Sequence, residues 1–354
     1  MYKYNRIYYL DLLKFIAILA VILVHVSAPF VVTSEINSLN YWVGHSVDSV
    51  FRFGMLIFVM ITGTLLLDEN YEFSYKKNWH HILRFFICFI IWSLTYVVIY
   101  EVIIPAIKGI EITSFDVIIK QFFKGHVHLW YLVMAIGLYL LIPLLRLWVK
   151  KENKKQVEYF LILSLIFCST IPLILDILNW FQIDLYNIDL FIENFNLYYV
   201  VGYVPFLILG WYLHNYDIKR RYIFYILALL SIGFTIVASW GFSSLTGKRV
   251  LLYESIYVTT GLVAFAVFLF FKHLFIHKEP RTRFWSWNIR FIAKHSLGFY
   301  AAHVGFSYMM SRILDRNWTN NALIVIPISF LAGFLLSYLL SWIFSLIPFM
   351  RKLV

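Results

Sequence analysis

The chain has 354 residues, of which 62% are hydrophobic and 14% are charged, and its formal net charge is +11. A soluble protein of this length is nearer half apolar and a quarter charged, so the composition excludes an ordinary soluble globular protein. The apolar runs are roughly 18 to 25 residues long, whereas a membrane β-barrel needs alternating segments of about ten residues. The sequence therefore predicts an all-α, polytopic integral membrane protein.

The basic residues fall in short clusters between apolar runs rather than in one patch. The positive-inside rule predicts this distribution for a membrane protein. We therefore expect the lipid bilayer, and no nucleic acid, to be the partner that the positive charge favours. The two cysteines, Cys88 and Cys168, both lie inside apolar runs, so neither a disulfide framework nor a zinc site is expected.

The first apolar segment, residues 8–30, follows Lys3 and Arg6 and so resembles a secretory signal sequence. However, Asp11 and Lys14 interrupt it, and the sequence that follows is a poor cleavage site. The segment is therefore expected to remain as the first transmembrane helix.

This first span carries Lys14 and His25, which are eleven residues apart. At about 100° per residue the two side chains share one helix face, about 16 Å apart along the axis. A cation near one membrane surface and an imidazole inside the membrane indicate two ends of one polar cavity. The alternative is a snorkelling lysine together with a histidine that a neighbouring helix satisfies.

Ten spans are predicted, and an even number puts both termini on one side of the membrane. Placing that side in the cytoplasm gathers most of the 30 basic residues there, which predicts an N-in, C-in orientation. The gaps 105–127 and 179–196 are too short for a soluble domain, so one transmembrane domain over 1–354 is expected, with interfacial helices or lids in these gaps. The spans are expected at 8–30, 46–67, 84–104, 128–148, 158–178, 197–214, 222–240, 251–275, 295–314 and 322–347.

The second span contains Asp48 and Arg52, four residues apart, which can form an ion pair on one helix face. One interpretation is a charge pair neutralised near the outer interface. The other is that Arg52 faces the same cavity as His25 and contacts an anionic or polar group of a substrate.

The loop before the third span ends in KKNWHHILR, which places Lys77, His81 and Arg84 near its cytoplasmic mouth. This basic rim suits a phosphate-bearing ligand. Taken alone, this cluster is equally typical of the basic residues that the positive-inside rule places in a cytoplasmic loop.

Spans four and nine add further histidines. Span four opens GHVHLWYL, with His126, His128 and Trp130, and span nine contains Tyr300 and His303. A His-x-His pair without a carboxylate or thiolate partner is weak as a metal signal. A lone membrane histidine usually bonds a neighbouring helix, but two of them in different helices favour a shared site.

Four stretches in this order resemble the membrane acyltransferase-3 family: YLDLLKFIAILAVILVHVS, FVMITGTLLL, HLWYL and HSLGFYAAH. The resemblance covers essentially the whole chain, and within the family it is nearest to the enterobacterial common antigen O-acetyltransferase type. The first-helix signature of the family, a basic residue followed by ten intervening residues and then a histidine, is met by Lys14 and His25. Of its R-x-x-R pair only Arg84 is matched, because His81 stands at the first position.

The resemblance implies transfer of an acyl group, usually acetyl, from cytoplasmic acetyl-CoA to a hydroxyl of a cell-envelope glycan or lipid-linked sugar. It implies a multi-pass protein of the bacterial cytoplasmic membrane that needs no metal. His25 would act as a general base or as an acyl carrier. The expected catalytic residues are His25, Lys14, Arg52 and His303; the expected donor-binding residues are Lys14, Lys77, His81 and Arg84; the expected acceptor-binding residues are Asp48, His128, Trp130 and Tyr300.

Two other functions stay open at this point. A transporter or exporter of an envelope precursor or amino acid would also place polar residues in its helices. The prolines do not show the paired placement that broken transporter helices favour. A structural membrane subunit is the least favoured, because buried charges would be a needless cost.

Overall fold

The computed structural model describes residues 6–111, 113–181, 194, 202–278, 282–348 and 350–353. These residues contain helices and no strand, which confirms the all-α prediction. In the gap 179–196, where an interfacial helix or lid is expected, the acidic residues Asp184, Asp189 and Glu193 lie outside the described residues. The helices are α1 (Tyr8–Thr33), α2 (Leu39–Phe51), α3 (Gly54–Leu66), α4 (Tyr75–Val97), η1 (Val98–Ile103), α5 (Ile104–Lys108), α6 (Phe115–Lys124), α7 (Trp130–Trp148), η2 (Lys151–Asn153), α8 (Lys154–Ser164), η3 (Leu165–Thr170), α9 (Ile171–Trp180), α11 (Val204–Asn215), α12 (Arg221–Thr246), α13 (Val258–Phe275), α14 (Arg283–Lys294), α15 (Ser296–Asn317), α16 (Ala322–Leu346) and η5 (Met350–Leu353).

Within the described part of the chain, 8 helices are long and apolar enough to cross a membrane. This supports a polytopic membrane protein, whereas the number ten and the N-in, C-in orientation stay predictions. The candidate spans are Tyr8–Thr33, Leu39–Leu66, Tyr75–Lys108, Trp130–Trp148, Lys151–Trp180, Arg221–Thr246, Val258–Phe275 and Ala322–Leu346.

Two expected spans are not among these candidates. For the span expected at 197–214, the described helix is α11, which has only 12 residues. For the span expected at 295–314, α15 has 22 residues, but serine, histidine and tyrosine side chains make it less apolar than the others. Buried polar side chains inside a bundle are typical of helices that line a site rather than face lipid.

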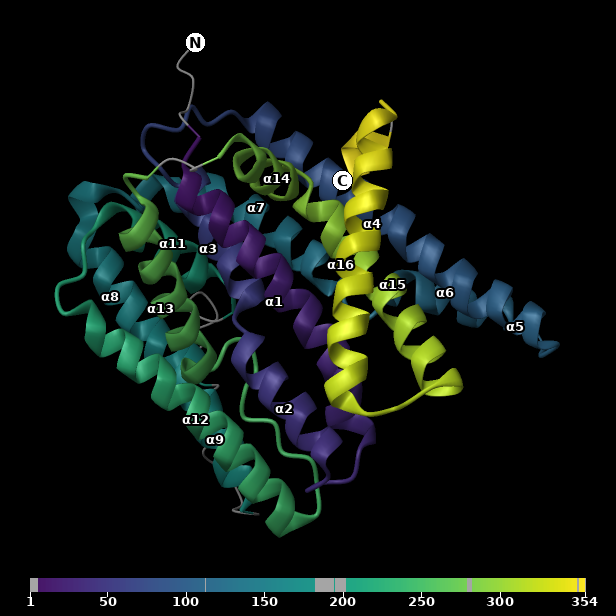
Figure 1. The fold of residues 1–354 in the computed structure, drawn as a ribbon. Coiled ribbons are helices and arrows are strands. Elements are labelled where there is room, and N and C mark those ends of the chain that lie inside the picture. The colour runs from purple at the N-terminus through teal and green to yellow at the C-terminus, as the bar shows by residue number, and fades with distance from the viewer. Residues whose placement is uncertain are drawn as a thin grey trace.

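Helix α1 lies at the centre of the bundle and contacts α2, α3, α13, α14, α15 and α16. The start of α1 and the end of α16 lie at the same end of the bundle (Figure 1). Gly54 at the start of α3 makes close packing possible, because a Cβ there would stand 2.8 Å from Cβ of Ala20. Side chains that project from α1 therefore meet residues from most of the chain.

The span expected at 251–275 begins later than predicted, because residues 247–257 are not helical and α13 starts at Val258. Val250, Leu252 and Tyr253 of this segment are nevertheless buried. The backbone N–H of Val250 donates to Oγ of Ser243 at 2.9 Å, and that of Leu252 donates to Oγ of Ser239 at 3.0 Å. Non-helical backbone at membrane depth is tolerated where the protein satisfies its polar groups, as α12 does here.

Helices α3 and α11 cross with their backbones in contact at two glycines. A Cβ on Gly63 would overlap the carbonyl of Leu207, and a Cβ on Gly210 would overlap the carbonyl of Met60. This is the small-residue packing that membrane helices use for close approach.

We predict that Gly63→Ala lowers the free energy of unfolding by roughly 1–3 kcal/mol, because a methyl group must separate two backbones. Unfolding in detergent by SDS titration measures this. The control is Gly233→Ala in α12, where no atom lies within 4 Å of the added Cβ. That change should stabilise the helix by up to about 1 kcal/mol. Equal effects of the two changes would contradict the close crossing.

Candidate active site

Three histidines from distant parts of the chain meet inside the bundle. His25 comes from α1, His128 from the turn before α7, and His303 from α15. The ring centroids are 5.1 Å apart for His25 and His303, 6.0 Å for His25 and His128, and 5.6 Å for His128 and His303. The predicted histidines therefore form one cluster.

The His128 ring is held in one orientation by hydrogen bonds at both of its nitrogens. Nε2 lies 3.2 Å from the carbonyl oxygen of Ala301, and Nδ1 lies 2.8 Å from Nδ1 of His126. A carbonyl only accepts, so Nε2 of His128 carries the proton, and Nδ1 of His126 must donate to Nδ1 of His128. Burial lowers the pKa of the His126 imidazole, which favours its neutral form.

His303 is also fixed by its own helix. Its Nδ1 lies 2.8 Å from the carbonyl oxygen of Tyr300 and 3.0 Å from that of Phe299. Nδ1 therefore donates, and Nε2 keeps a lone pair. Among the described residues this buried Nε2 has no hydrogen-bond partner. His303 thus presents an unused acceptor inside the cluster that contains His25.

His25 differs from its two neighbours because it is only partly buried. No hydrogen bond to its imidazole is present within the residues that the structure describes. Its ring is packed by His128 and His303, and the ring of Tyr300 stands 5.7 Å from His128. His25 is therefore positioned by packing while its nitrogens stay available.

Asp48 and Arg52 form the expected ion pair, with Nη2 of Arg52 2.8 Å from Oδ2 of Asp48. The Asp48 side chain is only 2% exposed. The guanidinium also lies over the ring of Tyr253, 4.9 Å from its centroid. Arg52 therefore pairs with a buried carboxylate and an aromatic ring inside the bundle, and its place in the His25 site stays a prediction.

A second group of basic residues gathers around the first half of α1. The charges of Arg84 and Arg6 act on Lys14, and Arg6 pairs with Asp11. Arg84 lies four residues from the exposed His80 and interacts with Tyr139.

Two further donor-site candidates lie on α4. The His81 ring stands 5.5 Å from the ring of Tyr139, so it shares this neighbourhood with Arg84. Lys77 is exposed. His81 and Arg84 thus share the neighbourhood of Tyr139, while one donor site formed by Lys14, Lys77, His81 and Arg84 stays a prediction.

The structure adds residues that the sequence did not single out. Tyr96 of α4 donates to the carbonyl of Ala301 at 2.9 Å, and its ring stacks on His126 at 4.5 Å. Tyr253 belongs to the non-helical segment 247–257. Only the H-x-H spacing could have indicated the contact between His126 and His128. The sequence gives no signal for the tyrosines, because they lie far from these histidines along the chain.

Trp130 is the predicted acceptor residue that lies furthest out, with 43% of its surface exposed. Its ring centroid is 5.6 Å from that of Tyr203. Only Leu129 separates it from His128 in the sequence, so it stands at the edge of the histidine cluster.

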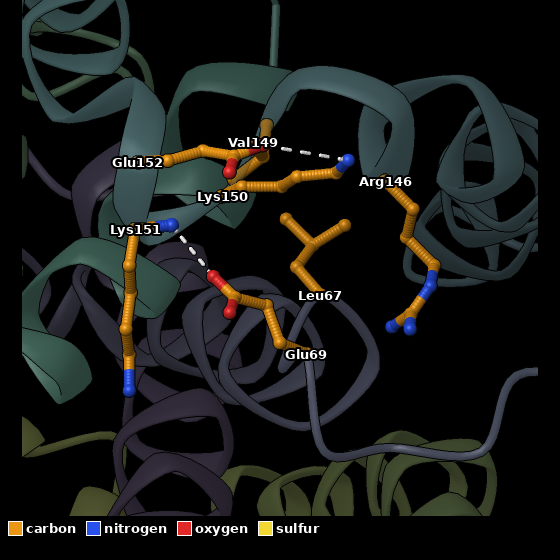
Figure 2. Close-up of a pocket in the computed structure, with 7 residues that line it drawn as sticks. All are labelled: Leu67, Glu69, Arg146, Val149, Lys150, Lys151 and Glu152. Atoms are coloured by element: carbon orange, nitrogen blue, oxygen red, sulfur yellow. Dashed lines mark hydrogen bonds and ion pairs between the residues drawn. The ribbon is translucent and has the colours of Figure 1, made fainter.

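A pocket of about 560 Å³ lies elsewhere in the described part of the molecule and contains none of the predicted site residues (Figure 2). Arg146 on its wall donates to the carbonyl oxygens of Leu66, Asp68 and Tyr71 at 2.5, 2.9 and 3.0 Å. Arg146 therefore closes the carboxyl end of α3. The pocket is lined by Leu67, Glu69, Arg146, Val149, Lys150, Lys151 and Glu152.

Residues 7–346 match the family model of the acyltransferase-3 family, described as an acyltransferase domain. The chain belongs to this family. No curated protein and no solved structure matches it. The family match covers both the histidine cluster and the basic group, so both belong to a membrane acyltransferase.

No group of histidine, cysteine, aspartate and glutamate side chains in the described part of this acyltransferase is arranged to hold a metal ion. The three clustered imidazoles instead pack edge to face or at a tilt, with two of them bonded to backbone carbonyls. Such an arrangement suits proton or acyl transfer at the remaining free nitrogens.

We predict that Arg52→Ala destabilises the acyltransferase by about 3–5 kcal/mol, because it leaves the buried Asp48 carboxylate without a counter-charge. The double change Asp48→Asn with Arg52→Ala should cost less than the single change. SDS titration of the purified proteins measures both values. A single variant that is no less stable than the double variant would contradict a structural role of the pair.

Proposed function

We propose that this membrane acyltransferase transfers an acetyl group from acetyl-CoA, bound from the cytoplasm, to a hydroxyl of an envelope glycan or lipid-linked sugar. The proposal rests on His25, a partly exposed intramembrane imidazole on the same helix as Lys14. We further propose that the protein is of the enterobacterial common antigen O-acetyltransferase type. It would lie in the bacterial cytoplasmic membrane with both termini in the cytoplasm.

The chemistry needs one group that manages a proton at neutral pH, and imidazole is suited to this. In the reaction the C–S bond of the thioester breaks and a C–O ester bond forms, while the hydroxyl proton passes to the thiolate of CoA. His25 either carries that proton as general base and acid or takes the acetyl group itself before the hydroxyl attacks.

His303 would support either route as a positioning residue. Its Nδ1 is fixed on backbone carbonyls, so the lone pair of Nε2 is available to accept a proton from the imidazole of His25. Acceptance of this proton would orient His25 and stabilise its charged form, as the third member of a catalytic triad does. Neither nitrogen of His128 is free for this task, because both are already hydrogen-bonded.

The donor would be bound at the other end of α1. Phosphate groups are recognised by clustered basic side chains, and Arg84 of α4 would join Lys14 of α1 in such a cluster. Lys77 and His81 on α4 would extend this basic surface. The spacing of about 16 Å between Lys14 and His25 separates the phosphates from the thioester, as the long pantetheine arm of CoA requires.

The first test is His25→Ala in nanodiscs. We expect CoA thiol release and acetyl transfer to fall at least about a thousandfold, because the variant loses the imidazole that carries the proton or the acetyl group. The protein should remain folded and inserted, as judged by size-exclusion chromatography and thermal unfolding.

The matched control is His273→Ala, which removes an exposed histidine of α13 and should leave the rate unchanged. Full activity of His25→Ala would exclude the mechanism. Substrate flux across proteoliposomes with no consumption of acetyl-CoA by the wild type would favour a transporter instead.

A second prediction concerns the donor. We expect Arg84→Ala to weaken acetyl-CoA binding about tenfold or more, because a charge-assisted hydrogen bond to phosphate contributes roughly 1.5–3 kcal/mol. Isothermal titration in nanodiscs measures this. Arg221→Ala, which changes an exposed arginine of α12, is the control. Equal donor affinity in all three proteins would remove Arg84 from the donor site.

A further inference from the structure

Helix α14 combines basic and aromatic side chains and contains no acidic residue, as its sequence RFWSWNIRFIAK shows. It lies at the end of the bundle where α1 starts and α16 ends (Figure 1). Its buried residues Ile289, Ile292 and Ala293 are three or four positions apart and so share one helix face. The helix is therefore attached to the bundle along this face, and its other faces point outward.

Hydrogen bonds to α1 and α16 hold α14 on the bundle. Nη2 of Arg6, which also bonds to Asp11 of α1, donates to the backbone carbonyl of Arg290 at 3.0 Å. The hydroxyl of Tyr338 in α16 donates to Oδ1 of Asn288 at 3.0 Å. Neither attachment uses the guanidinium of Arg290, so the helix is fixed without engaging this charge.

The outward surface of α14 places cations beside aromatic rings. Arg290 and Lys294 are exposed, and they share one face because they are four residues apart. Neither forms an ion pair within the described part of the chain. The side chains of Phe284, Trp285 and Trp287 are 72%, 58% and 53% exposed. Such a combination is typical of a helix that lies in the membrane interface, with rings at the headgroup level and cations near lipid phosphates.

Helix α6 has a similar amphipathic pattern but a different balance of charge. Its exposed rings are those of Phe115 and Phe123. However, Asp116 of α6 pairs with Lys120 at 3.5 Å, which leaves Lys124 as its remaining cation. Both helices thus expose aromatic rings, whereas α14 has no acid on the same helix to offset its basic residues. The charge of α14 is therefore complementary to an anionic surface.

We propose that Arg290 and Lys294, together with Trp287, form a binding surface for the headgroup of an anionic phospholipid in the adjacent leaflet. The two cations bind the phosphate, and the indole lies between the headgroup and the acyl chains. Because Arg6 bonds to both α14 and Asp11, the lipid surface is connected to the first turn of α1. The inference concerns lipid binding and does not depend on the acyl transfer proposed above.

The test places the protein in nanodiscs with equal amounts of phosphatidylglycerol and phosphatidylcholine, whose choline cation offsets its phosphate charge. Lipids that stay bound after transfer to mild detergent are counted by native mass spectrometry. We expect the wild type to retain phosphatidylglycerol in at least about threefold excess over phosphatidylcholine. The double variant Arg290→Gln with Lys294→Gln should lose most of this excess. The matched control, Lys120→Gln with Lys124→Gln in α6, removes the same charge and should keep the wild-type ratio.

A spin label at Phe284→Cys tests whether lipid covers the helix, and it reacts selectively because Cys88 and Cys168 are buried. We expect oxygen, which dissolves in lipid, to relax the nitroxide more strongly than an aqueous nickel chelate does. A label that is open mainly to nickel, or closed to both reagents as under a protein partner, would overturn the proposal. So would a wild type without an excess of phosphatidylglycerol, or equal losses in the two double variants.

Discussion

A histidine in a membrane-spanning helix must find its polar partners inside the protein, because lipid offers none. His128 and His303 meet this constraint through backbone carbonyls and His126. His25 is held by the rings of these two neighbours, and its imidazole has no hydrogen bond within the described part of the chain. Because α1 is packed by α2, α3, α13, α14, α15 and α16, its side chains can meet partners from distant parts of the sequence.

The sequence predicts best those features that one helix contains. The shared face of Lys14 and His25, the Asp48–Arg52 pair and the all-α class all follow from local spacing, and the structure is consistent with each. The family followed from short stretches in the right order, and the match over 7–346 confirms it.

Features that depend on contacts between distant segments could not be predicted. The apolar stretch from Leu251 resembles the start of a helix, yet its backbone bonds to Ser239 and Ser243 keep it extended up to α13. Tyr96 and Tyr203 carry no local signal, because tyrosine is common in this chain, with 25 occurrences. Their partners become visible only when α4 meets α15 and α11 meets α7 in three dimensions.

The 247–257 segment is held in the bundle by hydrogen bonds of its main chain and of Arg249 and by its buried side chains. Serine hydroxyls of α12 bind the N–H groups of Val250 and Leu252, and Arg249 donates to the carbonyls of Val31 and Ser34 at the end of α1. The exposed side chain of Glu254 takes no part in these bonds. Point changes at such an exposed position can therefore accumulate at low cost in stability, while the bonds that anchor the segment to α1 and α12 stay in place.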